Sequence, residues 1–119
     1  MYEDNFVIMS DKFDELVNII SRLRAPNGCK WDREQTHKSL KQNFIEETYE
    51  ALDAIDADDM KHLQEELGDV LLQVVLHAQI ADEEGAFTID DVADGISKKL
   101  VHRHPHVFGD LKVSSTKEI

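Results

Sequence analysis

The residues in this sequence that are best suited to chemistry are two pairs of acids. The members of each pair stand three positions apart: Glu47 with Glu50, and Glu66 with Asp69. Residues three apart on a helix share one face on adjacent turns. An acidic segment at 56–59 separates the pairs, and a tight helix–loop–helix hairpin there would bring them to similar heights. The spacing therefore predicts that four carboxylates converge.

Carboxylates that converge in this way repel one another, which raises their pKa values unless a cation neutralises them. An all-oxygen ligand set suits hard ions, so the expected cofactor is Mg²⁺, with Mn²⁺ as the other candidate. The absence of His and Cys at the four positions argues against zinc. A di-iron site would use Glu-x-x-His motifs, and the only one, Glu34 to His37, precedes the acid pairs. The alternative is a solvated acidic face.

A polar stripe continues from the second acid pair along its helix. Gln73 and His77 fall on the same helical face as Glu66 and Asp69, although segment 70–76 is otherwise apolar nearly all round. That segment could also form a strand, but its continuity with the flanking helical pattern favours a helix. Buried polar side chains need partners or ligands, so the stripe favours a site over a solvated face.

A second group of residues is basic. Lys99 and Arg103 are four positions apart, so they share a helix face in an otherwise acidic chain. Arg can bind a phosphate through two parallel hydrogen bonds and Lys acts as a point charge, so the pair suits a phosphorylated ligand. The alternative is that both form salt bridges with surface acids. The three histidines that alternate around Pro105 suit a helix end better than a metal site.

Helices must position these groups, and we predict an all-α fold, a four- to five-helix bundle. Ser10 is a candidate N-cap for the first helix. Thr88 and Asp91 have the spacing of a capping box that begins the fourth helix, and Pro105 ends it. Segment 25–32 holds a Pro and an Asn-Gly pair and is expected to be a loop. The helices are predicted at about residues 10–24, 36–55, 59–82 and 88–104.

Segment 70–76 of the predicted helix 59–82 carries more apolar surface than one short chain readily covers. A chain of 119 residues has a modest core, and segment 70–76 needs cover on every side. A single copy is therefore expected to leave part of this surface open. The predicted apolar side of helix 36–55 consists of Leu40, Phe44, Thr48, Ala51, Leu52 and Ile55.

Composition and charge exclude several classes of protein. Of the 119 residues, 41% are hydrophobic and 32% are charged, as in a single globular domain. The net charge of −12 opposes binding to nucleic acid or to an anionic membrane. The single cysteine, Cys29, excludes an internal disulfide and is expected to be buried or half-buried. No apolar run could span a membrane and residues 1–10 are not basic, so a cytoplasmic protein is expected.

Four short motifs carry a family resemblance. They are Gly28-Cys29-Lys30-Trp31-Asp32, Glu46-Glu47-Thr48-Tyr49-Glu50, Glu66-Leu67-Gly68-Asp69 and His102-Arg103-His104-Pro105-His106-Val107-Phe108. In this order they resemble the MazG family of nucleoside triphosphate pyrophosphohydrolases, over about residues 13–119. The resemblance implies an all-α bundle that forms a homodimer or a tetramer. It also implies Mg²⁺-dependent hydrolysis of a nucleoside triphosphate between the α and β phosphates, which gives a nucleoside monophosphate and pyrophosphate.

The resemblance also implies roles for individual residues. Lys99 and Arg103 are similar to the family's phosphate contacts. Glu46 is expected to be an acid beside the metal ligands or the base that orients the attacking water. Trp31 belongs to the first motif, where it either borders the nucleotide or anchors the core. The implied metal ligands are Glu47, Glu50, Glu66 and Asp69.

The function predicted from these observations is pyrophosphohydrolysis by metal-activated water in one MazG-like domain over residues 1–119. That domain could belong to a longer protein that continues past Ile119. Two alternatives remain open. The first is a catalytically weak or silent helical module for dimerisation or another interaction. The second is a metal-dependent phosphohydrolase that releases orthophosphate from a different substrate.

Overall fold

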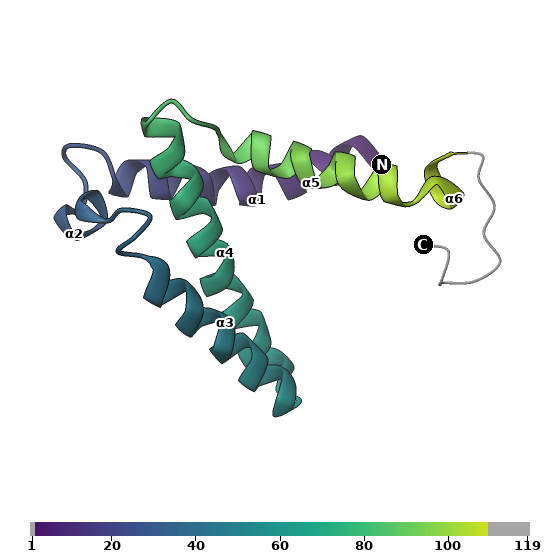
Figure 1. The fold of residues 1–119 in the computed structure, drawn as a ribbon, viewed down its shortest axis with the longest axis horizontal. Coiled ribbons are helices and arrows are strands. Elements are labelled where there is room, and N and C mark those ends of the chain that lie inside the picture. The colour runs from purple at the N-terminus through teal and green to yellow at the C-terminus, as the bar shows by residue number, and fades with distance from the viewer. Residues whose placement is uncertain (1, 110–119) are drawn as a thin grey trace.

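The computed structural model describes the backbone of residues 2–109 and the side chains from Lys12 to Gly109. Within these residues every regular element is a helix, which confirms the predicted all-α fold (Figure 1). None of these helices is long and apolar enough to cross a membrane. They are α1 (Tyr2–Leu23), α2 (Lys30–Glu34), α3 (Lys41–Asp56), α4 (Met60–Glu83), α5 (Ile89–Arg103) and α6 (Pro105–Phe108).

The α3 and α4 helices form the predicted antiparallel hairpin (Figure 1). The two helices can approach closely because Ala51 and Ala54 of α3 are buried and have short side chains. The chain reverses through Asp58, whose φ of 56° lies in the left-handed region. Asp59 then caps α4, because its Oδ1 accepts a hydrogen bond of 3.1 Å from the backbone N–H of His62. The turn thus fixes the first residues of α4.

The buried core lies where α1 and the second half of α4 pack together. Ile20, Leu40, Val75, Leu76 and Ile80 form one buried cluster. The predicted apolar spacing of the first helix supplies the α1 side of this cluster, and the apolar centre of α4 supplies the other side. Partly buried side chains that pack around the cluster are Phe13, Leu16, Val17, Leu72 and Ile89.

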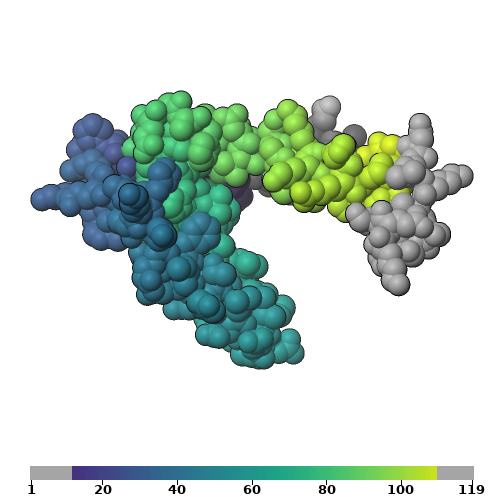
Figure 2. Space-filling model, in the orientation of Figure 1, coloured from purple at the N-terminus to yellow at the C-terminus, as the bar shows by residue number. Residues whose placement is uncertain are grey.

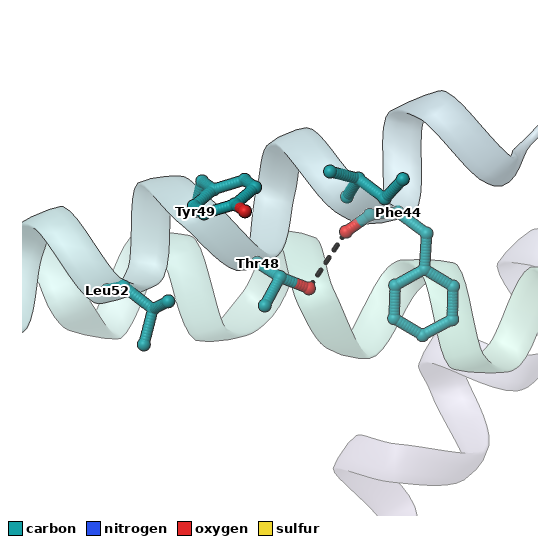
Figure 3. Close-up of a pocket in the computed structure, with 5 residues that line it drawn as sticks. Phe44, Thr48, Tyr49 and Leu52 are labelled. Carbon is teal, nitrogen blue, oxygen red and sulfur yellow. Dashed lines mark hydrogen bonds between the residues drawn. The ribbon is translucent and has the colours of Figure 1, made fainter.

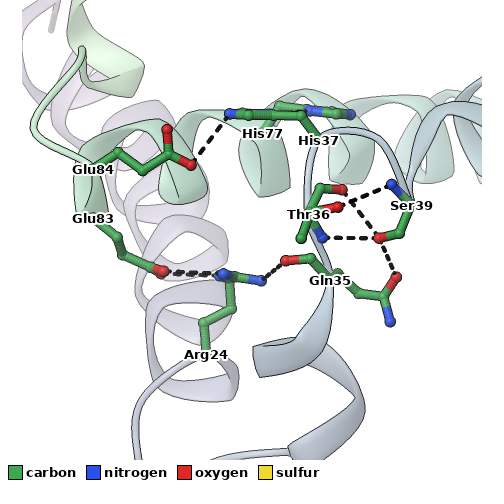
Figure 4. Close-up of polar contacts among 8 residues, drawn as sticks. All are labelled: Arg24, Gln35, Thr36, His37, Ser39, His77, Glu83 and Glu84. Carbon is green, nitrogen blue, oxygen red and sulfur yellow. Dashed lines mark hydrogen bonds and ion pairs between the residues drawn. The ribbon is translucent and has the colours of Figure 1, made fainter.

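Arg24 joins three segments near the C-terminal end of α4 (Figure 4). Its Nε and Nη2 donate to the two carboxylate oxygens of Glu83 at 2.9 and 3.0 Å. Its Nη1 donates to the backbone carbonyls of Asp32 and Gln35, the latter at 3.1 Å. The side chain of Arg24 is nearly buried, so these charge-assisted bonds hold the loop after α1 and the end of α2 against α4.

The helix boundaries differ from the prediction mainly in the first third of the chain. Ser10 does not cap a helix, because α1 begins at Tyr2 and runs through it. No Gly or Pro stands before Ser10, so nothing in residues 2–9 stops the helix. The segment 25–32, predicted as a loop, contains the start of the short α2. Cys29, the residue before α2, is half-buried as expected.

The α3 helix corresponds to the predicted helix 36–55, but it begins at Lys41 instead of residue 36. Hydroxyl side chains explain the difference. The Thr36 backbone N–H donates to Ser39 Oγ at 2.8 Å, and the Ser39 backbone N–H donates to Thr36 Oγ1 at 3.1 Å. These local bonds compete with helical geometry. By contrast, α4 and α5 lie within one residue of their predicted bounds, and α5 ends before Pro105 as predicted.

The α5 helix leaves the end of α4 that lies opposite the hairpin turn, and it is exposed from Asp90 to its C-terminal end (Figures 1 and 2). Thr88 and Asp91 form the predicted capping box, with bonds of 2.9 and 3.2 Å. No residue of α5 is buried, and Val92, Ile96 and Leu100 stay 38 to 50% exposed. Figure 2 shows the hairpin and α5 diverging with open space between them.

The predicted apolar side of helix 36–55 is only partly buried. Leu40 and Ala51 are buried, whereas Leu52 and Ile55 are about half exposed. The two buried residues within α3 are Ala51 and Ala54, so α3 meets α4 through its small residues. The larger apolar residues therefore face outward from a single copy of the chain.

Candidate metal centre

Three of the four predicted acids meet where α3 and α4 face each other. Glu47 comes from α3, and Glu66 and Asp69 come from α4; one carboxylate oxygen of each lies within 4.8 Å of the other two. Glu66 is only 6% exposed, and its Oε2 has no hydrogen-bond partner among the described residues. A buried carboxylate oxygen without a partner is costly, so binding of a cation at this oxygen would be favourable.

Glu50, the fourth acid, lies beside Glu66. The Glu66 carboxylate is the largest influence on Glu50, and it raises the pKa of Glu50 above its usual range. The pKa of Glu47 is also raised, first by burial and then by the charge of Asp69. Repulsion among neighbouring carboxylates is the largest cause of the Glu50 shift and adds to the effect of burial at Glu47.

These residues fit a divalent cation that prefers oxygen ligands. The donor set consists of carboxylates from two facing helices, which is the set that Mg²⁺ and Mn²⁺ prefer. A cation at this position would satisfy the open oxygen of Glu66 and offset the repulsion that raises the pKa of Glu50.

Two further polar side chains of α4 extend the site along the helix. Gln73, which belongs to the predicted polar stripe, is 5% exposed, and its Oε1 has no partner among the described residues. His62 lies with its Nε2 3.0 Å from Glu66 Oε1. His62 was not predicted, although its position four residues before Glu66 is the signal that could have found it.

His77, the other member of the stripe, bonds to a second histidine and not to the acids of the cluster. Its Nδ1 lies 2.8 Å from Nδ1 of His37, and the ring planes differ by 5°. Parallel rings in face-to-face contact would keep all their atoms at least about 3.5 Å apart. The two rings therefore lie nearly in one plane, with a hydrogen bond between their edges in which one Nδ1 donates and the other accepts. Burial, and then the charge of His37, lowers the pKa of His77.

The other predicted site residues lie outside this cluster. Glu46 is exposed, and its Oε1 accepts a hydrogen bond of 3.2 Å from Gln42. Lys99 and Arg103 are exposed on α5, which leads away from the hairpin (Figure 1). A single copy therefore does not bring these basic residues to the acids. Trp31 is 55% exposed on the short surface helix α2, so its interpretation as a core anchor is wrong.

An open groove of about 410 Å³ runs along α3, and Figure 3 shows its lining. The hydroxyl of Thr48 is occupied inside the helix, because it donates to the Phe44 carbonyl at 2.8 Å. The remaining lining is apolar apart from one phenol, so the groove suits a protein surface better than a charged phosphate. The lining residues are Phe44, Ile45, Thr48, Tyr49 and Leu52.

The fold and the site define an all-α protein with a cluster of carboxylates on a helical hairpin. Comparison with known families identifies the family of this protein, because residues 35–108 match the MazG nucleotide pyrophosphohydrolase domain. The chain belongs to the MazG family. The fold is also that of a mazG-related protein from Thermotoga maritima, whose crystal structure superposes with a TM-score of 0.73. That match has 26% identity and covers 88% of this chain and 90% of the other.

Curated relatives are more similar in sequence. A nucleoside triphosphate pyrophosphohydrolase/pyrophosphatase MazG from Thermotoga maritima is 59% identical over 106 residues, which are 89% of this chain and 42% of that protein. The nucleoside triphosphate pyrophosphohydrolase of Escherichia coli K12 is 49% identical over 92% of this chain and 42% of its own length. The uncharacterized protein YabN of Bacillus subtilis is 59% identical over 94% of this chain. The chain spans less than half the length of each of these relatives.

Proposed function

We propose that this protein hydrolyses nucleoside triphosphates between the α and β phosphates, with Mg²⁺ or Mn²⁺ bound at the hairpin. One observation carries the proposal. In a chain of the MazG family, Glu66 is almost fully buried with one unpartnered oxygen, in a cluster with Glu47 and Asp69. Such an oxygen is expected at a cation site and is costly on a merely solvated face.

The acids divide into two roles in this proposal. Glu47, Glu50, Glu66 and Asp69 hold the metal, which supplies positive charge to neutralise the phosphates and lowers the pKa of water. Glu46 is exposed beside them, with one oxygen held by Gln42, and it accepts the proton of the attacking water. The water oxygen bonds to the α-phosphorus, the bond from that phosphorus to the bridging oxygen breaks, and pyrophosphate leaves. The products are a nucleoside monophosphate and pyrophosphate.

The protein acts as a homodimer, or as a tetramer built from such dimers, in this proposal. The support is that α5 carries Lys99 and Arg103 on an exposed helix that also presents Ile96 and Leu100 to solvent. The outward side of α3 offers an apolar groove next to exposed acids, which complements the apolar and basic residues of α5 in hydrophobicity and charge. A second copy that lays its α5 along α3 covers both apolar surfaces and brings Lys99 and Arg103 to the phosphates.

Product analysis tests the proposed reaction. The protein is incubated with Mg²⁺ and a panel of canonical and modified nucleoside triphosphates, and monophosphate, pyrophosphate and orthophosphate are measured. We expect equal amounts of monophosphate and pyrophosphate, and a loss of at least about 100-fold in Glu50→Gln. Asp56→Asn, at the exposed end of the same helix, is the matched control that removes one charge outside the cluster. Release of orthophosphate alone would replace this proposal with a different phosphohydrolase.

A helical interaction module without catalysis is the second candidate. It is favoured by the exposed apolar residues of α3 and α5, which are expected of any module that binds another helix. This candidate predicts an oligomer whose thermal midpoint does not respond to Mg²⁺ or to nucleotide. Ligand linkage requires a rise in the midpoint if a metal site exists, so the two candidates give opposite results in one titration.

A further inference from the structure

His62 is the one basic side chain that forms an ion pair with an acid of the cluster among residues 12–109. Its Nε2 lies 3.0 Å from Glu66 Oε1, one helical turn further along α4. The two oxygens of Glu66 therefore have different surroundings. Oε1 is held by the imidazole, whereas Oε2 is buried and without a partner.

The hairpin turn holds His62 at a fixed place. Asp59 caps α4 by accepting a hydrogen bond from the His62 backbone N–H, and Asp58 sets the preceding turn in the left-handed region. The imidazole thus stands on the first turn of a capped helix and reaches one turn along it. This gives a continuous path of contacts from the turn, through His62, to Glu66.

We propose that His62 is a positioning residue, which orients Glu66 so that its Oε2 is presented to the metal. This inference rests on the proposed function, because it takes Glu66 as a metal ligand. A glutamate side chain has three rotatable bonds, and a hydrogen bond at one oxygen restricts the position of the other. Hydrogen-bond partners behind metal ligands commonly contribute 10- to 100-fold to metal affinity.

A simple surface ion pair is the competing explanation, and the environment of Glu66 distinguishes the two. Exposed pairs at this spacing contribute little because water surrounds both partners. Here the carboxylate side is only 8% exposed, while the imidazole is 43% exposed. The bond therefore orders a buried carboxylate through a partly exposed partner, which a pair of exposed side chains does not do.

The same helices supply a conservative replacement for the test. Gln42 donates from Nε2 to Glu46 at 3.2 Å, and Gln79 donates to Glu83 at 3.2 Å, both across four residues. A glutamine at position 62 can therefore make the same bond to Glu66 without an imidazole. His62→Gln keeps the hydrogen-bond donor, and His62→Ala removes it.

Binding of Mn²⁺ alone, followed by electron paramagnetic resonance without nucleotide, tests the inference. We expect His62→Ala to weaken Mn²⁺ binding by about 10- to 100-fold and His62→Gln to restore it to within about 3-fold of the wild type. Lys61→Ala, an exposed basic neighbour on the same turn, is the matched control and should bind normally. Thermal midpoints without metal confirm that all variants are folded.

Three other results would overturn the inference, and they differ in what they say about the proposed function. If Glu66→Gln loses Mn²⁺ but His62→Ala binds it normally, the metal site stands and the role of His62 does not. If His62→Gln fails as badly as His62→Ala, the hydrogen bond is not the cause. If the wild type itself binds no Mn²⁺, the proposed metal centre and this inference fail together.

Discussion

The α3/α4 hairpin and α5 are equally well formed as helices, but they differ in what surrounds them. In the hairpin, Ala51 and Ala54 let the helices pack closely, and buried Glu66 lies between them. The α5 helix has a complete capping box at Thr88, yet none of its residues is buried. Local signals are therefore enough to form a helix, whereas burial of α5 depends on packing that residues 12–109 of a single copy do not provide.

The same division runs through the proposed site. The acids that would hold the metal lie on the hairpin, and the basic residues that would hold the phosphates lie on α5. If the two regions act together, they belong to different copies of the chain. Most of the following predictions compare the effect of a substitution in the hairpin with the effect of one in α5, and the others test the hairpin alone.

The largest expected effect comes from dimers that combine an acid variant with a basic variant. Glu50→Gln and Arg103→Ala should each lose at least about 100-fold of turnover on their own. Dimers with one copy of each, isolated through two different tags, should recover about half of the wild-type rate. The reason is that a site built from the acids of one copy and the α5 of the other is intact once per dimer.

The matched control for that experiment pairs two variants of the hairpin. Dimers of Glu50→Gln with Glu47→Gln have a damaged acid cluster in both sites, so their turnover should stay at the level of the single variants. If the mixed dimers with Arg103→Ala are equally inactive while the wild type is active, each site is contained in one chain.

A core substitution and an α5 substitution should affect stability very differently. Leu76 is 3% exposed, so Leu76→Ala should lower the free energy of unfolding by about 3 kcal/mol. Leu100 is 48% exposed, so Leu100→Ala should cost the single chain less than about 0.5 kcal/mol. Urea unfolding measures the first effect, and sedimentation at several concentrations should show that Leu100→Ala weakens the dimer. If both variants lose the same free energy of unfolding, Leu100 is buried within its own chain and not at a contact between copies.

Without metal, the hairpin acids should destabilise the fold, and Glu50→Gln should make it more stable. The pKa of Glu50 is raised, chiefly by the neighbouring Glu66 carboxylate, so the folded state binds a proton more readily than the unfolded chain. This group therefore favours folding only at low pH, and the contribution is lost as pH rises through the folded pKa. Near neutral pH and without Mg²⁺, the thermal midpoint of Glu50→Gln should be higher than that of the wild type. Addition of Mg²⁺ should raise the midpoint of the wild type but not that of Glu50→Gln. A lower midpoint in the metal-free variant would contradict this account.

Much of this fold could be predicted from the sequence, because its strongest signals are local. Segment 70–76 continues the helical pattern on both sides, and Thr88 with Asp91 begins α5 where their spacing predicts. The start of α3 could not be predicted in the same way. The hydroxyls of Thr36 and Ser39 bond to backbone groups, and this local competition leaves no trace in apolar periodicity.

The site was predictable to the extent that it follows helix geometry. The spacing of the acids indicates their convergence, and the structure brings Glu47, Glu66 and Asp69 together; their role as metal ligands stays a prediction. The position of Lys99 relative to the acids depends on how α5 packs, which helical periodicity does not specify. His62 could have been found from its spacing of four residues to Glu66. A search for pairs of acids does not include a histidine.

The smallest effect we expect concerns His77, which links the hairpin to the connection before α3. The pKa of His77 lies below its ordinary value of 6.5, first because partial burial of the ring disfavours its charged form and then because of the charge of His37. The unfolded chain therefore takes up a proton at a higher pH than the folded chain does. The stability from this group is fully present above about pH 6.5 and is lost as pH falls towards the folded pKa.

The charged groups around the histidine pair determine how this loss should be measured. Glu84 lies 3.9 Å from Nε2 of His37, and Lys41 lines the hollow next to His77, where its positive charge opposes a proton on the His77 ring. Urea unfolding at about pH 7.5 and about pH 5.5 should show a larger loss of stability in the wild type than in His77→Gln. His37→Gln, which removes the neighbouring imidazole but leaves His77 partly buried, should fall between them. If all three proteins lose the same stability, the carboxylates alone control the acid response, and the edge-to-edge pair contributes nothing to the stability of the hairpin.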